Sequence, residues 1–107
     1  MINPVGRWRI LWMKMWGQDF FDLIEPGHYR FDENGLGYFI FGAVEGQIDY
    51  RLSDDGQRFE LSWSGNEEGG EKSGRGWFEV ISPDTAEGRF YIHCGDESVL
   101  EISKLVS

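Results

Sequence analysis

The sequence has little cysteine, proline or positive charge, and it has no long hydrophobic run. Of its 107 residues, one is cysteine and 3 are proline. Because Cys94 has no partner in the chain, no internal disulfide can form, and nothing points to an oxidising compartment. The longest apolar stretch, residues 38–44, is interrupted by Gly42 and is far shorter than the ~18 residues that a membrane-spanning helix needs. We therefore expect neither a disulfide-stapled secreted protein nor a membrane protein.

Positive charge is scarce, with 10 basic residues against 19 acidic ones and a net charge of -9. Such a chain repels phosphate groups on average, which argues against a nucleic-acid partner. Residues 1–16 lack the charged head and uninterrupted apolar stretch of a secretory signal, so we expect a cytoplasmic protein. A chain of this length builds a single hydrophobic core, and the sequence predicts one domain over residues 1–107.

What the sequence has in abundance is a two-residue alternation of hydrophobic and polar positions. Phe59, Leu61 and Trp63, for example, alternate with Arg58, Glu60 and Ser62. This period is typical of half-buried β-strands. Eight segments show it or are rich in aromatic and β-branched residues, and they predict strands. The segments are residues 7–12, 28–32, 36–44, 47–52, 58–63, 76–81, 89–94 and 98–103.

Short turn signals separate these segments and determine the predicted topology. Asn34-Gly35, Asp55-Gly56 and Ser82-Pro83-Asp84 are typical of tight connections, which join antiparallel strands. The glycine-rich residues 65–76 predict a flexible hairpin loop, and residues 17–23 predict one short helical turn. With no helix to cover a sheet, we expect an all-β, mainly antiparallel, up-and-down barrel of about eight strands, with a β-sandwich as the alternative.

Two features bear on the shape of this barrel. Glycines within or beside the predicted strands, namely Gly37, Gly42, Gly46 and Gly76, are expected to mark bends. Residues 8–16 and 36–44 are hydrophobic at both odd and even positions, although a barrel has only one inside. Some of these side chains must line a cavity, face another subunit or lie under the helical turn, unless a β-bulge exchanges the two faces along the first strand.

The opening Gly6-Arg7-Trp8 resembles the Gly-x-Trp that begins the first strand of the calycins, the lipocalin and avidin-like barrels. That resemblance implies a ligand-binding barrel, with Lys104 standing where these proteins have an arginine that stacks on the tryptophan. A longer resemblance is to small bacterial proteins of unassigned function, and it implies a bacterial cytosolic single-domain protein. Its matching segments are residues 6–10, 19–23, 26–27, 41–42, 46–51, 62–63, 73–77 and 93–96.

The sequence favours a non-enzymatic binding module. Four aromatic side chains on predicted strands are expected to hold a small apolar ligand in the barrel mouth, or the two-faced strands bind a protein partner or form a homodimer. The four are Trp8, Trp12, Tyr50 and Trp63. The alternative is an acidic inhibitor or immunity-like protein that neutralises a basic partner through Glu67, Glu68 and Glu71.

The patterns for other chemistry are weak, and we predict no metal, no cofactor and no catalytic residue. His28, His93 and Cys94 contain no pair with metal-ligand spacing, because neighbours in a strand point to opposite faces, and Cys94 is expected to be buried and inert. Asp49 and Glu60 could form the acid pair of a hydrolase. Arginines beside both favour a solvated charge ladder instead.

Overall fold

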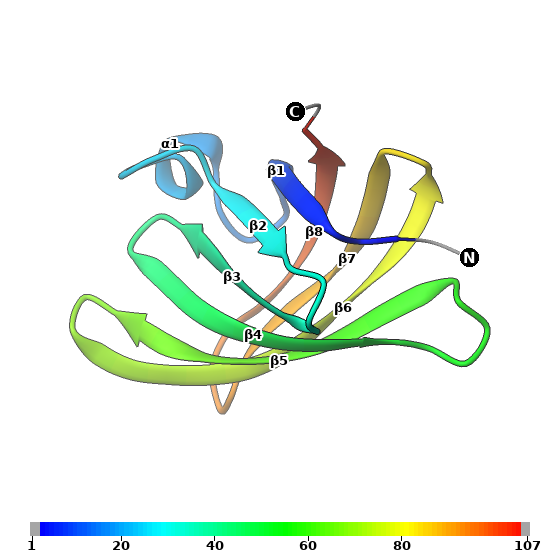
Figure 1. Ribbon diagram of the computed structural model, residues 1–107. Helices are drawn as coiled ribbons and strands as arrows, with labels where there is room; N and C mark the ends of the chain where they lie inside the picture. Colours follow the sequence, from blue (N-terminus) through cyan, green and yellow to red (C-terminus); the bar gives the residue numbers. More distant parts are fainter. Residues whose placement is uncertain (1–2, 106–107) are drawn as a thin grey trace.

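The chain forms a closed antiparallel barrel of eight strands, as predicted (Figure 1). The computed structural model describes residues 3–105. Each strand pairs with the next in sequence, and β8 returns to pair with β1. The strands are β1 (Gly6–Met13), β2 (His28–Phe31), β3 (Leu36–Phe41), β4 (Val44–Leu52), β5 (Arg58–Glu67), β6 (Gly70–Ser82), β7 (Thr85–Ile92) and β8 (Glu97–Lys104). No helix of residues 3–105 is long and apolar enough to cross a membrane.

The three turn predictions are confirmed in position, whereas the predictions for residues 36–44 and 65–76 were wrong. The segment predicted as one strand over residues 36–44 is broken by a turn at Gly42, where φ is +58°, and Ala43. A turn so soon after Phe41 needs a positive φ, which glycine adopts at little cost. The predicted flexible loop over residues 65–76 is a ladder in which Glu67 pairs with Gly70 around a two-residue turn, Glu68-Gly69. Both turn residues have positive φ, as in the tight turns that fit twisted hairpins.

Inward-facing glycines let the barrel walls come close together. Gly46 is buried opposite Gly65 on β5, and a Cβ at Gly46 would lie 2.7 Å from ring atoms of both Phe39 and Trp63. At Gly37 a Cβ would run into the backbone carbonyl of Arg30 on β2. Gly46, predicted as a bend, therefore makes room for two aromatic rings, and Gly37 lets the backbone of β3 lie close to that of β2.

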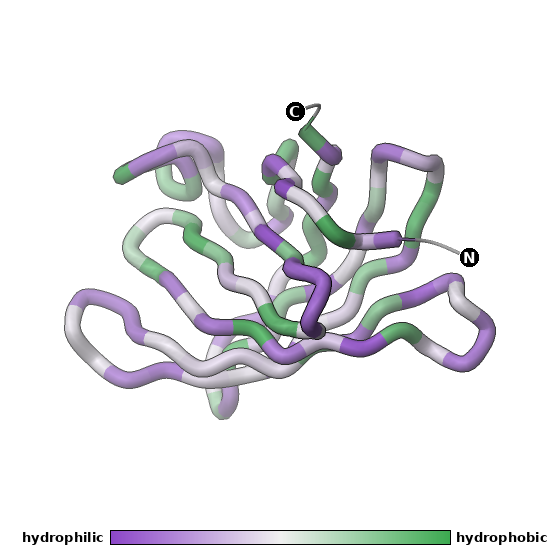
Figure 2. Tube along the Cα trace, viewed as in Figure 1, coloured by the Kyte–Doolittle hydropathy of each residue, from purple (hydrophilic) through white to green (hydrophobic). Residues whose placement is uncertain are grey.

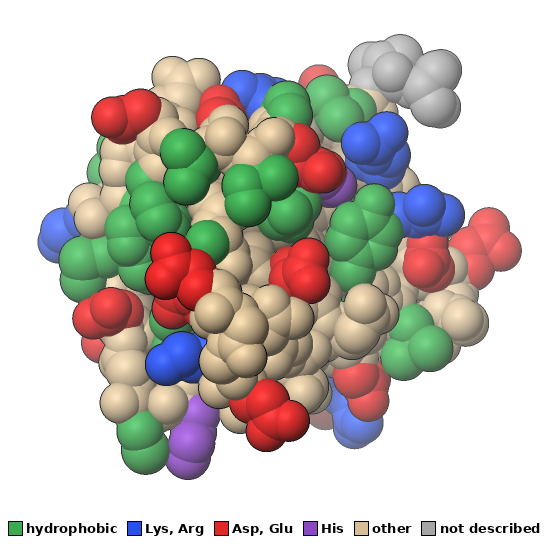
Figure 3. Space-filling view, turned by 90° about the vertical axis from the view of Figure 1, so that its left-hand side faces the viewer, with side chains coloured by type: hydrophobic (Ala, Val, Ile, Leu, Met, Phe, Trp, Pro, Cys, Tyr) green, Lys and Arg blue, Asp and Glu red, His purple; other side chains and the backbone are tan. Residues whose placement is uncertain are grey.

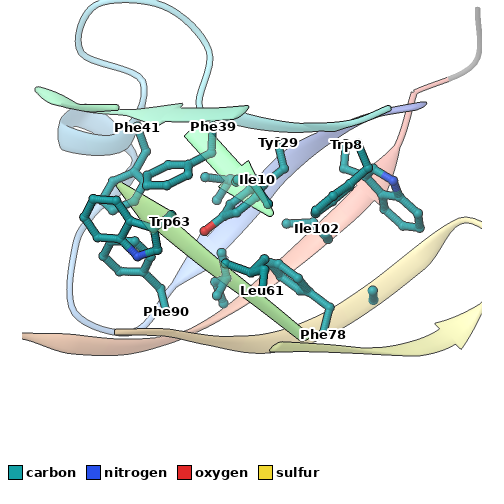
Figure 4. Packing of buried hydrophobic residues seen from close by; sticks show 14 of the residues in the cluster. Trp8, Ile10, Tyr29, Phe39, Phe41, Leu61, Trp63, Phe78, Phe90 and Ile102 are labelled. Carbon is teal, nitrogen blue, oxygen red and sulfur yellow. The ribbon is translucent and has the colours of Figure 1, made fainter. Parts of the chain in front are cut away.

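The inside of the barrel is filled with side chains. In Figure 2 hydrophobic and hydrophilic positions alternate along most strands, and the hydrophobic ones supply the core. Aromatic rings from strands that do not pair with each other meet inside the barrel, with centroids 5.0 Å apart for Phe31 and Phe59, 5.1 Å for Phe39 and Trp63, and 4.9 Å for Phe41 and Phe90. Figure 4 shows the last two pairs. Edge-to-face packing of this kind adds about 0.5–1.5 kcal/mol per pair to the burial of area.

A β-bulge lies in the middle of β1. Ile10 pairs with Ile102 and Trp12 pairs with Glu101, so that Leu11 is an extra residue on the β1 side. Ile10 and Met13 are buried, whereas Leu11 and Trp12 are exposed by 52% and 47%. The bulge that the two-faced pattern suggested is thus present, and it places two large hydrophobic side chains on the outer surface.

The short helix α1 (Gln18–Phe21) covers one end of the barrel, at the left in Figure 1. Phe21 from this helix is 2% exposed. Trp16 and Phe20 pack on Phe41, with ring centroids 5.3 Å and 6.4 Å away. The predicted helical turn is confirmed, and its aromatic side chains close this end of the core.

Candidate functional site

The four aromatic residues expected to bind a ligand do not lie around one opening. Trp8 and Trp63 are 1% and 3% exposed, and they lie at opposite ends of the packed core in Figure 4. The Trp63 ring lies 5.3 Å from that of Phe90, and its Nε1–H donates to the Tyr91 carbonyl. Both rings therefore serve to fill the barrel.

The other two members of the set lie elsewhere. Tyr50 is half-buried, its hydroxyl donates to the Asp32 carbonyl, and burial raises its pKa, with Asp32 and Glu33 nearby adding to the effect. Trp12 was expected inside the mouth and lies on the outer surface because of the β1 bulge. A ligand held between all four side chains would need space that the packed interior does not provide.

Trp8 is held by one hydrogen bond and lies under Lys104. Its Nε1–H donates to the Pro4 carbonyl at 2.8 Å, and the Lys104 ammonium lies 5.7 Å from its ring centroid. A cation this close to an indole face is attracted to the ring. Lys104 therefore covers Trp8 from the last strand.

A second bulge, in β6, exposes another aliphatic side chain. Val80 pairs with Ala86 and Ser82 with Thr85, so Ile81 is the extra residue, and it is 62% exposed. The side chains of Leu11 and Ile81 thus project outward from β1 and β6, the two strands that flank the β7–β8 pair. Both line one shallow groove of about 190 Å³ over β7 and β8. Its other lining residues are Thr85, Ala86, Glu87, Glu101 and Ile102.

Acidic side chains cross this face in a row. Glu87 on β7 pairs directly with Glu101 on β8 and with Glu79 on β6. Arg58 lies 3.6 Å from Glu79, whereas no Lys or Arg among residues 3–105 is within ion-pair distance of Glu87 or Glu101. Like charges directly opposite each other destabilise a sheet, so this arrangement has an energetic cost in the free protein. We call Leu11, Trp12, Ile81, Glu87 and Glu101 the acidic face.

The glutamates predicted to bind a basic partner lie at another place. Glu67, Glu68 and Glu71 are at the tip of the β5–β6 hairpin, and Glu68 and Glu71 are exposed. Figure 3 views the α1 end of the barrel, where hydrophobic side chains gather in the upper part and acidic ones lie among and below them. Around α1 the exposed hydrophobic residues are Met15, Leu23 and Ile24, which are 51%, 63% and 65% exposed.

His28, His93 and Cys94, the residues considered for metal binding, do not form a metal site. His28 is 4% exposed, and its Nδ1 donates to the Pro26 carbonyl at 2.7 Å, since a carbonyl can only accept. Cys94, expected to be buried in a strand, is exposed in the turn after β7, where its sulfur lies 3.5 Å from Nε2 of His93. Within residues 3–105, no three His, Cys, Asp or Glu side chains form a group able to hold a metal ion.

The Asp49 and Glu60 pair also separates. Glu60 lies opposite Arg51, as a charge ladder requires, whereas Asp49 lies opposite Ser62. The two carboxylates are therefore diagonal rather than directly opposite. The expected ladder is present only at Arg51 and Glu60, because Arg58 lies opposite Glu79 instead.

Sequence reasoning missed the acidic face because both bulges had to be known first. Counting back from the turn at Pro83-Asp84 without a bulge would place Glu87 opposite Val80, whereas the extra Ile81 moves it opposite Glu79. The predicted strand over residues 89–94 also began too late to include Glu87. Comparison of the chain with protein-family models, curated proteins and solved structures finds no match.

Proposed function

We propose that this protein is a non-enzymatic binding module that recognises a basic protein segment through its acidic face. The observation that carries the proposal is the Glu87–Glu101 pair, which lies between two exposed aliphatic side chains and has no lysine or arginine of residues 3–105 within ion-pair distance. A partner that brings an arginine or lysine to the pair would remove the repulsion between the carboxylates. The proposal keeps the basic partner that was predicted for Glu67, Glu68 and Glu71, and it places the binding surface on the acidic face instead.

The filled interior supports a partner outside the barrel. Eight-stranded barrels are just wide enough for side chains to occupy them completely. Here aromatic rings take up that volume, and Trp8 and Trp63 have no free face of any size. A small apolar ligand in the barrel mouth would have to displace these rings and lose the packing that stabilises the fold.

The chemistry of the acidic face supports a basic partner that also has hydrophobic side chains. Leu11, Trp12 and Ile81 offer apolar contact on both sides of the carboxylate pair. Tryptophan is among the residues that contribute most to protein interfaces. A second copy of this chain is a less suitable occupant, because each copy has a net charge of -9.

The resemblance to calycin barrels stays a proposal. It is supported by the eight-stranded up-and-down topology and by Lys104 lying over Trp8. The relation would concern the barrel framework, because the ligand-binding interior that it implies is occupied here by aromatic side chains.

The experiment that tests the function compares two double variants with equal changes in charge. The probe is a fluorescein-labelled octapeptide of alternating arginine and leucine, whose binding is followed by fluorescence anisotropy. Glu87→Gln with Glu101→Gln is expected to weaken binding about fivefold or more, since two charge-assisted contacts are lost. Glu68→Gln with Glu71→Gln removes the same charge at the exposed hairpin tip and should change binding less than about twofold.

A third variant tests the apolar half of the acidic face. Leu11→Ser with Ile81→Ser leaves the charge unchanged and should also weaken the peptide, because about 50–60% of each side chain is available to it. If the two glutamate double variants lost peptide affinity equally, the binding would be explained by the net charge of the protein alone, and the proposal would be overturned. A homodimer that dissociates on Leu11→Ser would overturn it too, by showing that this face is occupied by a second copy.

A further inference from the structure

A second groove, on the other side of β1, has the opposite charge. It occupies about 600 Å³ at the beginning of β1 and the end of β8, and it shares no lining residue with the acidic face. Its lining residues are Val5, Gly6, Arg7, Arg30, Phe31, Asp32, Lys104 and Leu105. A volume of this size is in the range of sites for small organic ligands.

Two arginines, Arg7 and Arg30, line this groove side by side, although the whole chain has only 10 lysine and arginine residues. Arg7 on β1 lies directly opposite Arg30 on β2, and both are exposed. Arg30 gives its Nε–H to Asp32 at 2.9 Å, whereas no acidic side chain among residues 3–105 is within ion-pair distance of Arg7. Lys104 also lines the groove, but it pairs with Trp8, and its ammonium lies over the buried Trp8 ring, on the opposite face of the sheet from the two arginine side chains.

The opposed arginines destabilise the free sheet in the same way as the opposed glutamates do elsewhere. Asp32 offsets one of the three positive charges, so the lining carries a net charge of about +2 in a protein whose total is -9. An anion placed between Arg7 and Arg30 would relieve this repulsion, because Arg30 keeps further guanidinium N–H groups beside the one that it gives to Asp32.

The rest of the lining is hydrophobic. Val5 is half-buried and Leu105 is 44% exposed beside the cations, where its backbone N–H donates to the Arg7 carbonyl. Gly6 has a φ of +132°, and a Cβ at this position would lie 3.0 Å from Cε of Lys104. The glycine thus leaves room for the lysine side chain along the groove.

We propose that this groove binds a small organic anion, a carboxylate with an apolar chain, with the carboxylate between Arg7 and Arg30 and the chain against Val5 and Leu105. Inorganic anions would satisfy only the cations. Apolar cations would satisfy only the hydrophobic wall, even though the overall charge of the protein attracts them. The combination of both kinds of contact gives the site its expected preference.

The test is a titration followed by ¹H–¹⁵N NMR spectra, with three probes used below any micelle concentration: decanoate, decyltrimethylammonium and inorganic phosphate. Decanoate is expected to shift the backbone amide signals of Gly6, Arg7, Arg30 and Leu105 and to bind more tightly than the other two. Arg7→Gln should weaken decanoate about three- to fivefold, the size of an exposed ion pair, and Lys104→Met, which removes a charge on the opposite face of the sheet, should weaken it less. Lys104→Met keeps the aliphatic stem over Trp8, and the spectrum itself reports whether each variant is folded.

Arg51→Gln is the matched control, because Arg51 is an exposed outer-face arginine on β4, opposite Glu60. It removes the same charge as Arg7→Gln and should leave decanoate binding unchanged. Equal weakening by Arg51→Gln would overturn the site, as would decanoate shifts centred on residues outside the groove. Phosphate binding as tight as decanoate would overturn the apolar half of the ligand. None of these outcomes depends on the acidic face, so the two proposals can fail separately.

Discussion

Trp8 and Trp12 belong to the same strand, four residues apart, yet they have opposite surroundings. Trp8 is 1% exposed, hydrogen-bonded to the Pro4 carbonyl and covered by Lys104, whereas Trp12 is 47% exposed on the outer surface. A regular strand would give both residues the same face. The extra residue at the β1 bulge separates them, so one tryptophan stabilises the fold and the other is available for contact.

The outer surface also contains two kinds of region, which differ in whether the charges of paired strands are opposite or alike. On β4 and β5, Arg51 lies opposite Glu60, which is a favourable cross-strand pair. On β7 and β8, Glu87 lies opposite Glu101, and on β1 and β2, Arg7 lies opposite Arg30. The like-charge pairs cost stability in the free protein, and each occurs in a groove with exposed hydrophobic neighbours. Both features point to partners that bring the missing opposite charge.

The largest expected effect concerns the two tryptophans. Trp8→Ala should lower the free energy of unfolding by about 3–5 kcal/mol, because it leaves a cavity in the core. Trp12→Ala should change it by less than about 0.5 kcal/mol, since the side chain lies outside the packed barrel. Urea denaturation followed by far-ultraviolet circular dichroism measures both. Similar losses for the two variants would contradict the division that the β1 bulge produces.

The strands of this barrel could be predicted because their cause is local. Alternation places Phe59, Leu61 and Trp63 on one face, and all three are buried. Glycines and turn residues such as Asn34-Gly35 then mark where neighbouring strands join. Eight strands without covering helices leave closure as a natural way to hide the apolar face.

The sites could not be predicted in the same way, because they depend on register between strands. One extra residue in β1 moved Trp12 outside, and one in β6 placed Glu87 opposite Glu79. The two-faced pattern of residues 8–16 suggested a bulge in the first strand but not its position, and no pattern suggested the bulge at Ile81. The groove beside Arg7 lies where the first strand pairs with the last, and no local pattern in the sequence indicates this pairing.

A smaller effect concerns Arg9, the outer-face residue of β1 that the α1 segment partly covers. Its guanidinium lies 2.8 Å from Asp22. Although partial burial raises the pKa of Asp22, hydrogen bonds from Gly27, Gln18 and Arg9 outweigh it, and the pKa lies below its usual value of 3.8. Asp22→Asn should therefore cost about 1 kcal/mol at neutral pH.

The sign of the pH dependence follows from this lowered pKa. The stability that Asp22 contributes is fully present above its unfolded pKa and is lost as the pH falls through the lower pKa of the folded state. The difference between the original protein and Asp22→Asn should thus shrink below about pH 4. Urea titrations from pH 7 to pH 2.5 test this, with Asp49→Asn, on the exposed outer face, as the control. A gap that stays constant down to pH 2.5 would rule out the carboxylate charge as its source.

The smallest expected effects test whether the Glu87–Glu101 pair lowers the free energy of unfolding while the Arg51–Glu60 pair raises it. Glu87→Gln removes one carboxylate from a like-charge pair and should raise the free energy of unfolding by about 0.2–1 kcal/mol. Glu60→Gln removes the partner of Arg51 and should lower it by a similar amount. Because both residues are exposed, screening at 0.5 M salt should reduce both effects. Two changes of the same sign at low salt would mean that net charge, rather than the pairing of strands, determines the energy of these faces.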